Sequence, residues 1–243
     1  MTPHAAIIVS HGQPGAPAPP EVALARLAAQ VSAALPDGWQ VGSATLAMPD
    51  ALEAALEAAP ASPLVYPMFM SEGWFTRTEL PRRIGAAPAR PTRPFGTDPD
   101  LPKMAAALLR EVLDARGWQA GQTTLFLAGH GSGRSARTAQ DTRAFADALA
   151  ALLPFRETRL GFVEQAPFLQ EAAQGLDKRS ICLPFFAAKL GHVLDDLPEA
   201  LKATDFKGIA LEPIGCAPQV PALVAKALLK AQADHAPAPT TAQ

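Results

Sequence analysis

Two histidines in the second half of the chain are placed where a metal site can form. His130 directly follows the apolar segment 124–129, and His192 comes shortly after the apolar segment 180–186. Neutral imidazole is a ligand for divalent iron, cobalt, nickel or zinc. A single histidine in such a place is more simply a polar loop residue or a satisfied core residue. The pair His130 and His192 predicts a metal site, and whether His11 contributes stays open.

An acidic residue, Glu164, lies between these two histidines in the sequence. It directly follows the apolar segment 159–163. Its carboxylate is a suitable third ligand, but a solvated strand end explains the same residue, and both interpretations stay open. In the first half, Leu46 and Phe75 occupy the positions that correspond to Glu164 and His192. The predicted site therefore belongs to the second half.

Several charged residues near these histidines have two interpretations. Asp195 and Asp196 begin an expected helix, where capping or a favourable interaction with the helix dipole is the simpler role and metal binding the alternative. Lys189, Arg134 and Arg137 lie near the histidine loops, where they either hold substrate carboxylates or form part of a solvated surface. The nearby aromatic residues are expected in the core: Phe69, Trp74, Phe185 and Phe186.

The elements that must position these residues alternate between strand and helix. Apolar segments predict strands at 5–10, 40–47, 64–70, 92–95, 124–129, 159–163, 180–186 and 209–213. Helices are expected at 21–35, 50–58, 79–84, 102–116, 138–153, 168–173, 196–203 and 221–231. This alternation predicts an α/β protein with parallel sheets. Because parallel strands end at one edge of a sheet, His130, Glu164 and His192 are expected near one point.

The pattern occurs twice, which indicates an internal duplication. His11 and His130 lie 119 residues apart, and Phe75 and His192 lie 117 apart. A Pro-x-Gly-x-x-Pro-x-x-Pro frame starts at Pro94 and again 119 residues later. We predict a first α/β domain over 1–118, a second over 119–232 that holds the candidate site, and a disordered tail over 233–243. A ligand cleft is expected between the two domains.

Composition excludes several classes of protein. The chain has 243 residues, of which 49% are hydrophobic, and a formal net charge of −2, which gives no reason to expect a nucleic-acid or anionic-membrane partner. Its apolar runs are too short to cross a bilayer, and no basic segment marks a signal peptide. The two cysteines lack metal or disulfide spacing, which favours a reducing cytoplasm.

Other catalytic motifs are absent from the histidine segments. Neither His11-Gly12 nor His130-Gly131 follows the arginine of a phosphohistidine phosphatase loop. The segment 129–133, Gly-His-Gly-Ser-Gly, is neither a phosphate-binding loop nor a nucleophile elbow. No Cys-x-x-Cys pair is available for a thiolate metal site. A metal-dependent hydrolase would need a carboxylate-rich shell that we do not find.

The sequence resembles the class II tetrapyrrole chelatases, the sirohydrochlorin cobaltochelatase and ferrochelatase family. The likeness covers about residues 5–232 and depends on four features. These are His130-Gly131-Ser132 with Arg134, Phe162-Val-Glu164-x-x-Pro167, Pro184-Phe-Phe followed by Gly191-His192-Val-x-x-Asp196-Leu-Pro198, and the repeated Pro-x-Gly-x-x-Pro frame. Gly133 departs from the family pattern, because it separates the serine from the arginine.

The resemblance implies two similar α/β domains, each with a four-stranded parallel sheet flanked by helices. It implies insertion of Co²⁺ or Fe²⁺ into sirohydrochlorin or a related tetrapyrrole, without a nucleotide, in cobalamin or siroheme biosynthesis. His130 and His192 would bind the metal and transfer protons, with Glu164 contributing. Basic side chains, Arg134 and Lys189 with Ser132, would hold the macrocycle. The alternative is a non-catalytic tetrapyrrole or metal-binding protein of the same fold.

Overall fold

Two four-stranded parallel sheets form the framework of the protein, seen in a computed structural model that describes residues 4–133 and 135–234. The first sheet has the order β2-β1-β3-β4 and contains β1 (His4–Ser10), β2 (Trp39–Thr45), β3 (Leu64–Pro67) and β4 (Arg90–Pro91). The second has the order β6-β5-β7-β8 and contains β5 (Thr124–Gly129), β6 (Glu157–Phe162), β7 (Ser180–Pro184) and β8 (Ile209–Ala210). The predicted fold class is confirmed.

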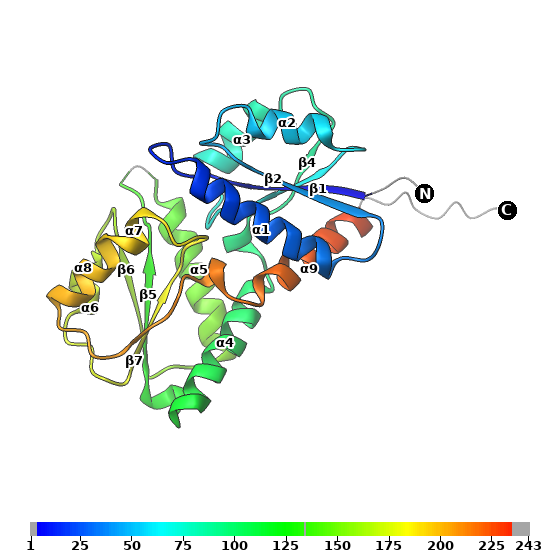
Figure 1. Ribbon diagram of the computed structural model, residues 1–243. Helices are drawn as coiled ribbons and strands as arrows, with labels where there is room; N and C mark the ends of the chain where they lie inside the picture. The colour runs from blue at the N-terminus through cyan, green and yellow to red at the C-terminus, as the bar shows by residue number, and fades with distance from the viewer. Residues whose placement is uncertain (1–3, 134, 235–243) are drawn as a thin grey trace. The chain divides into compact units, whose positions relative to one another are not determined.

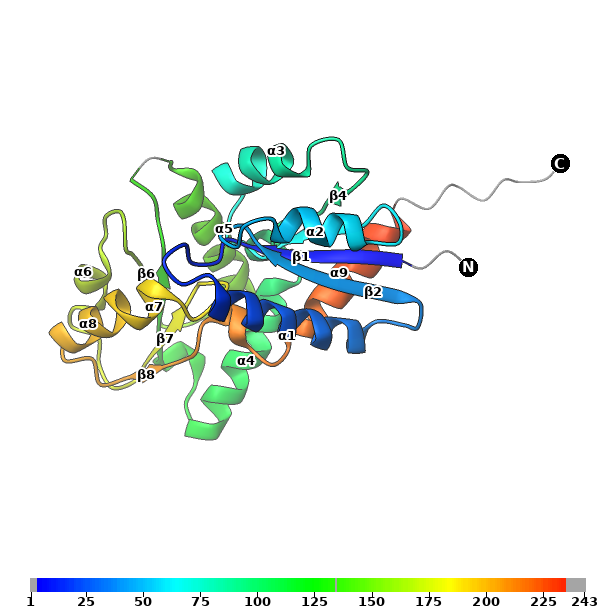
Figure 2. The ribbon, with the colours of Figure 1, turned by 45° about the horizontal axis from the view of Figure 1, so that its top comes forward.

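Helices cover both faces of the first sheet. They are α1 (Ala18–Ala34), α2 (Ala51–Ala58), α3 (Leu80–Ile84) and α9 (Val220–Ala233). Figures 1 and 2 show α2 and α3 on one side of this sheet and α1 and α9 on the other. Every residue of β3 is buried, as expected for a strand that is enclosed on both faces.

The second sheet is enclosed in the same way. Its helices are α4 (Leu101–Arg116), α5 (Arg137–Leu152), α6 (Leu169–Ala173), α7 (Gly191–Leu194) and α8 (Asp196–Ala203). In Figures 1 and 2, α6 and α8 lie on one side of the sheet and α4 and α5 on the other. Short turns of other helix types complete the fold: η1 (Phe75–Glu79), η2 (Phe95–Thr97), η3 (Ala120–Gln122) and η4 (Ile214–Cys216). No helix in the described part of the chain is long and apolar enough to cross a membrane.

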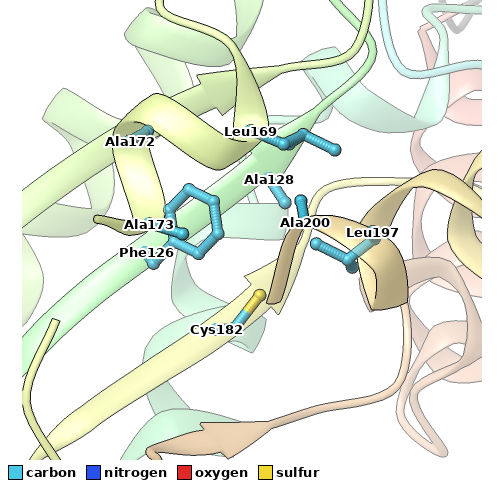
Figure 3. Packing of buried hydrophobic residues seen from close by; sticks show 8 residues of the cluster. All are labelled: Phe126, Ala128, Leu169, Ala172, Ala173, Cys182, Leu197 and Ala200. Carbon is cyan, nitrogen blue, oxygen red and sulfur yellow. The ribbon is translucent and has the colours of Figure 1, made fainter. Parts of the chain in front are cut away.

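An apolar cluster joins the second sheet to α6 and α8. Phe126 of β5 and Cys182 of β7 meet Leu169 and Leu197 from the two helices, together with small alanine side chains (Figure 3). Burial of a large apolar side chain stabilises the fold by about 1.5–3 kcal/mol. Burial also raises the pKa of the Cys182 thiol to about 12, so this sulfur is a neutral core group and not a thiolate metal ligand.

The chain forms two compact units, and each unit contains the last helix of the other half of the sequence. One unit holds the first sheet and takes α9 from the end of the chain. The other holds the second sheet, and it takes α4 and the segment 68–79 from the first half of the sequence. The domain boundary between residues 118 and 119 was drawn from the repeat, and it stays a prediction.

The strand register corrects one correspondence between the halves. Thr45 pairs with the last residue of β1, and Phe162 pairs with the last residue of β5. Two positions beyond these residues lie Ala47 and Glu164, so Ala47 and not Leu46 is the counterpart of the acid. The offset between matching positions of the two halves is one residue smaller at Ala47 and Glu164 than at the proline that follows each of them. The sequence alone does not show where this offset changes.

Several element boundaries also differ from those predicted. β4 and β8 have only two residues each: β4 lies wholly before the predicted strand 92–95, and β8 covers only the start of the predicted strand 209–213. Proline explains both cases, because Pro94 and Pro213 have no N–H group to donate to a neighbouring strand. In addition, α7 forms in an expected loop, and α9 extends to Ala233, the first residue of the predicted tail. Residues 235–243 of that tail lie outside the described residues.

The repeated Pro-x-Gly frame has a steric cause. The N–H groups of Gly96 and Gly215 donate to the carbonyl oxygens of Phe69 and Phe186, at 2.9 and 3.0 Å. A Cβ atom on Gly96 would overlap the backbone of Met70, and one on Gly215 would overlap the backbone at position 187. Only glycine allows this close crossing of two backbone segments, which explains why it recurs in both halves.

Gly215→Ala is therefore expected to destabilise the fold. The added methyl group must displace backbone, so the free energy of unfolding should fall by about 1–3 kcal/mol or more. Urea unfolding followed by circular dichroism measures this change. Gly121→Ala is the matched control, because nothing lies within 4 Å of a Cβ at that position. Equal stabilities of the two variants would contradict the steric explanation.

Candidate metal centre

The second sheet places its polar residues at a topological switch point. The chain passes from β6 to β7 across the central strand β5, so the strand order reverses at β5. In open α/β sheets, ligands bind beyond the carboxyl ends of the strands at such a point. His130 directly follows β5, Glu164 follows β6, and His192 lies in α7, which follows β7.

Backbone hydrogen bonds hold the loop after β6 against the loop after β5. The carbonyl oxygen of His130 accepts bonds from the N–H groups of Val163 and Glu164, at 3.1 and 3.0 Å. Gly131 has a φ of +67°, and a Cβ there would lie 2.8 Å from the Cβ of Phe162. Glycine after His130 thus permits the close approach that brings the acid beside the imidazole.

The three predicted ligands converge in space. The imidazole rings of His130 and His192 are 4.6 Å apart between centroids and nearly perpendicular, at 88°. Nδ1 of His130 lies 3.8 Å from Oε2 of Glu164. One ligand atom from each residue lies within 4.8 Å of the other two, the one such grouping of three or more His, Cys, Asp or Glu residues that the described part of the chain contains.

The cluster is open and not fully closed around an ion. Its side chains are 39% (His130), 49% (Glu164) and 42% (His192) exposed. Metal bonds to imidazole and carboxylate of about 2.0–2.2 Å allow two ligand atoms to be at most about 4.4 Å apart, so small side-chain movements close the set. Two imidazoles and one carboxylate leave coordination positions free, which suits iron, cobalt, nickel or zinc.

His192 has a second carboxylate neighbour. Its Nδ1 lies 2.8 Å from Oδ2 of Asp196, four residues further along the chain. The expected role of Asp195 and Asp196 is to cap α8 or to complement its dipole; α8 has no side-chain cap bond, but Asp196 lies in its first turn. The i, i+4 spacing of histidine and acid was visible in the sequence, and helical neighbours at this spacing face each other. Sequence reasoning missed the contact because it placed His192 in a loop and not in a helix.

Ser132 and Lys189 already have partners in the protein. The N–H group of Ser132 donates to Oε1 of Gln165 at 2.9 Å, and its Oγ accepts from the N–H group of Ser135 at 3.2 Å. Nζ of Lys189 donates to Oε1 of Glu212 at 2.7 Å in an exposed ion pair. Neither residue belongs to the three-residue cluster, and their predicted contacts with a substrate stay predictions.

Arg134, a predicted substrate contact, lies outside the described residues. Arg137 donates to Glu72 at 3.1 Å and lies 3.8 Å from Asp141. The Arg77 guanidinium beside Glu72, with a further hydrogen bond from Arg137, holds the pKa of the Glu72 carboxyl below its usual range. This ionised network ties the segment 68–79 to the start of α5.

Among the residues that the structure describes, the first half has no counterpart of this cluster. The side chain of His11 is exposed, and its carbonyl oxygen accepts a bond from Ala47 as that of His130 does from Glu164. Ala47 supplies no carboxylate. Phe75 replaces the second histidine.

The aromatic residues follow the predicted core placement only in part. Phe185 and Phe186 are buried, and Phe69 is half-buried under the ring of Phe75, with 5.8 Å between centroids. Trp74, expected in the core, is 59% exposed and meets the edge of Phe75 at 5.0 Å. Its neighbour Phe75 is the first residue of a π-helical turn.

A small hollow lies beside the cluster, between α6 and α8. It has a volume of about 220 Å³, and its walls include Phe162, Phe168, Asp196 and Glu199. Sites for drug-sized ligands usually occupy roughly 300–1,000 Å³. The volume of this hollow is below that range.

Parallel α/β sheets with a His–Glu–His cluster at a switch point define a chelatase-like protein. The CbiX family model matches residues 124–231. The solved structure of CbiX, the terminal enzyme for biosynthesis of siroheme in denitrifying bacteria, is 46% identical, with a TM-score of 0.84. The match covers 94% of this chain and 98% of that one. The chain belongs to the CbiX family, a class II chelatase family, and the predicted resemblance is confirmed.

More distant structures share the fold. SirB from Bacillus subtilis with Fe³⁺ is 16% identical, with a TM-score of 0.73, over 95% of this chain and 98% of that one. The sirohydrochlorin chelatase SirB from Bacillus subtilis subspecies spizizenii in complex with cobalt is 18% identical, with a TM-score of 0.64, over 94% and 93%. A comparison with curated proteins finds no match.

We expect the cluster to bind Co²⁺ before any tetrapyrrole is present. His130→Ala removes one of the three candidate ligands and should weaken Co²⁺ binding by at least about 10–100-fold. This is the loss that follows when a residue hydrogen-bonded to a metal ligand is mutated, and the loss of a ligand itself should be no smaller. Isothermal titration of the tetrapyrrole-free protein measures this affinity. His11→Ala is the matched control and should keep the parent affinity. Unchanged binding by His130→Ala would place the metal elsewhere.

Proposed function

We propose that this protein inserts Co²⁺ or Fe²⁺ into sirohydrochlorin or a closely related tetrapyrrole, a step of siroheme or cobalamin biosynthesis. The convergence of His130, Glu164 and His192 at the switch point is the observation that carries the proposal. The 46% identity to CbiX over 94% of the chain supports the same reaction. The two SirB structures that contain Fe³⁺ and cobalt support the choice of metal.

The first task of the site is to hold the ion without trapping it. Each imidazole offers one lone pair, and Glu164 adds a negative charge that favours a divalent cation. The remaining coordination positions face solvent, because all three side chains are about half exposed. Pyrrole nitrogens can then replace water and afterwards the protein ligands. An open set of three ligands therefore suits transfer better than storage.

The second task is to remove protons. As the ion enters the macrocycle, pyrrole N–H protons leave, one for each positive charge of the ion. The His130 imidazole and the Glu164 carboxylate are both partly exposed, at 39% and 49%, so each can accept a proton from the macrocycle and release it to water. Positioned acid–base catalysis of this kind accelerates a reaction by about 10²–10⁴-fold.

The macrocycle also requires cationic partners for its carboxylates. We propose Arg134 and Lys189 for this role, with Ser132 as a neutral hydrogen-bonding partner. Lys189 is available because its ion pair with Glu212 is exposed, and exposed pairs of this type contribute only about 0–1 kcal/mol. A substrate carboxylate can replace Glu212 at little cost. The free cysteines, Cys182 and Cys216, support action in a reducing compartment such as the cytoplasm.

The test is an assay of metal insertion. Insertion is monitored by the change in absorption of sirohydrochlorin after Co²⁺ or Fe²⁺ is added. The parent protein should exceed the protein-free rate, and His192→Ala should lose at least about 100-fold because it lacks both a ligand and a proton acceptor. His11→Ala should keep most of the activity.

Two other outcomes would change the assignment. If His11→Ala were inactive and His192→Ala active, the reaction would belong to the first half of the chain. If the parent bound the tetrapyrrole or the metal with no gain in rate, the protein would be a non-catalytic binding protein of the same fold.

A further inference from the structure

The contact between His192 and Asp196 is short and local. Nδ1 of His192 and Oδ2 of Asp196 are 2.8 Å apart, and the two residues lie on consecutive helices, α7 and α8. Both side chains are about half exposed, at 42% and 48%. The i, i+4 spacing makes the contact depend on the local fold of residues 192–196 and not on distant elements.

We propose that Asp196 is a positioning residue that acts on the metal through His192. Its carboxylate accepts a hydrogen bond from the Nδ1–H group of the imidazole, which keeps the proton on Nδ1 and leaves the lone pair on Nε2. A metal-binding histidine commonly donates its other N–H to a carboxylate, which holds the ring in place and raises its strength as a ligand. This inference rests on the proposed function, because it requires that His192 binds the metal.

The two histidines are supported differently. Nδ1 of His130 lies 3.1 Å from the carbonyl oxygen of Gly131 and 3.8 Å from the Glu164 carboxylate, itself a candidate ligand. His192 has, in Asp196, a carboxylate neighbour that is outside the three-ligand cluster. Asp196 therefore supports a ligand without occupying a coordination position.

The simpler role for Asp196, at the start of a helix, is to complement the helix dipole. An acid also occupies the matching position in the first half, Glu79, where Phe75 has replaced the histidine. Negative charge in a first helical turn is generally favourable. The presence of an acid alone thus does not identify its role, and the 2.8 Å contact with Nδ1 is the distinguishing observation.

Charge-matched variants separate these roles. Asp196→Asn keeps the size of the side chain, but its amide can donate to Nδ1 and so favour the wrong tautomer. We expect it to weaken Co²⁺ binding by the tetrapyrrole-free protein by about 10–100-fold. Glu199→Gln removes one negative charge from the same helix and should change the affinity by no more than about two- to threefold, as for an exposed charge. Equal effects of the two substitutions would overturn the proposal.

A spectroscopic measurement tests the tautomer directly. Protein labelled with ¹⁵N in its histidines should show His192 with its proton on Nδ1 in long-range ¹H–¹⁵N spectra at mildly alkaline pH. Asp196→Asn should shift this signal towards the Nε2–H form and leave the His11 signal unchanged. A parent protein with His192 in the Nε2–H form would overturn the proposal.

A combined variant distinguishes action through His192 from a direct effect on the ion. In the His192→Ala background, Asp196→Ala should cause no further loss of Co²⁺ affinity, because residues that act as a unit are not additive. A full further loss would overturn the proposal. Parent protein that binds Co²⁺ and shows the Nδ1–H tautomer but fails to insert metal would count against the proposed function alone, and the positioning role would stand.

Discussion

Parallel pairing on both sides of β5 is the constraint on which the candidate site depends. Because β6 and β7 flank this central strand in the same direction, three loops emerge at one edge of the sheet. The bonds from the N–H groups of Val163 and Glu164 to the carbonyl oxygen of His130 then draw two of these loops together. The chemistry of the cluster thus follows from backbone geometry first and from side chains second.

The duplication kept this scaffold and changed the side chains on it. In both halves a carbonyl at the end of the first strand accepts a bond from the loop after the second, and in both a glycine allows two backbone segments to cross. The polar set survives only where Glu164 and His192 are present. In the first half, Ala47 and Phe75 stand in their places. Packing constraints and chemical constraints therefore act on different positions of the same repeat.

Most of the fold and the grouping of the three ligands could be predicted from the sequence, because apolar segments at regular spacing specify a parallel α/β fold and parallel strands share one edge. The edge strands could not, since prolines such as Pro94 and Pro213 end strands that hydrophobicity alone would extend. The role of Asp196 was missed because it depends on α7, a helix of four residues that has no clear sequence signal. The exposure of Trp74, next to a π-helical turn, was also not predicted, because a large aromatic residue is expected in the core.

The spread of the ligand atoms has a consequence for how an ion is chosen. A rigid, enclosed site can reject ions by radius, whereas ligand atoms up to 4.8 Å apart on half-exposed side chains impose no fixed radius. Affinity for such nitrogen and oxygen donors then follows the intrinsic order of the first-row metals, in which copper and nickel exceed cobalt and iron. Fidelity for any one of these ions must come from outside the cluster, from the free concentration of each metal around the protein.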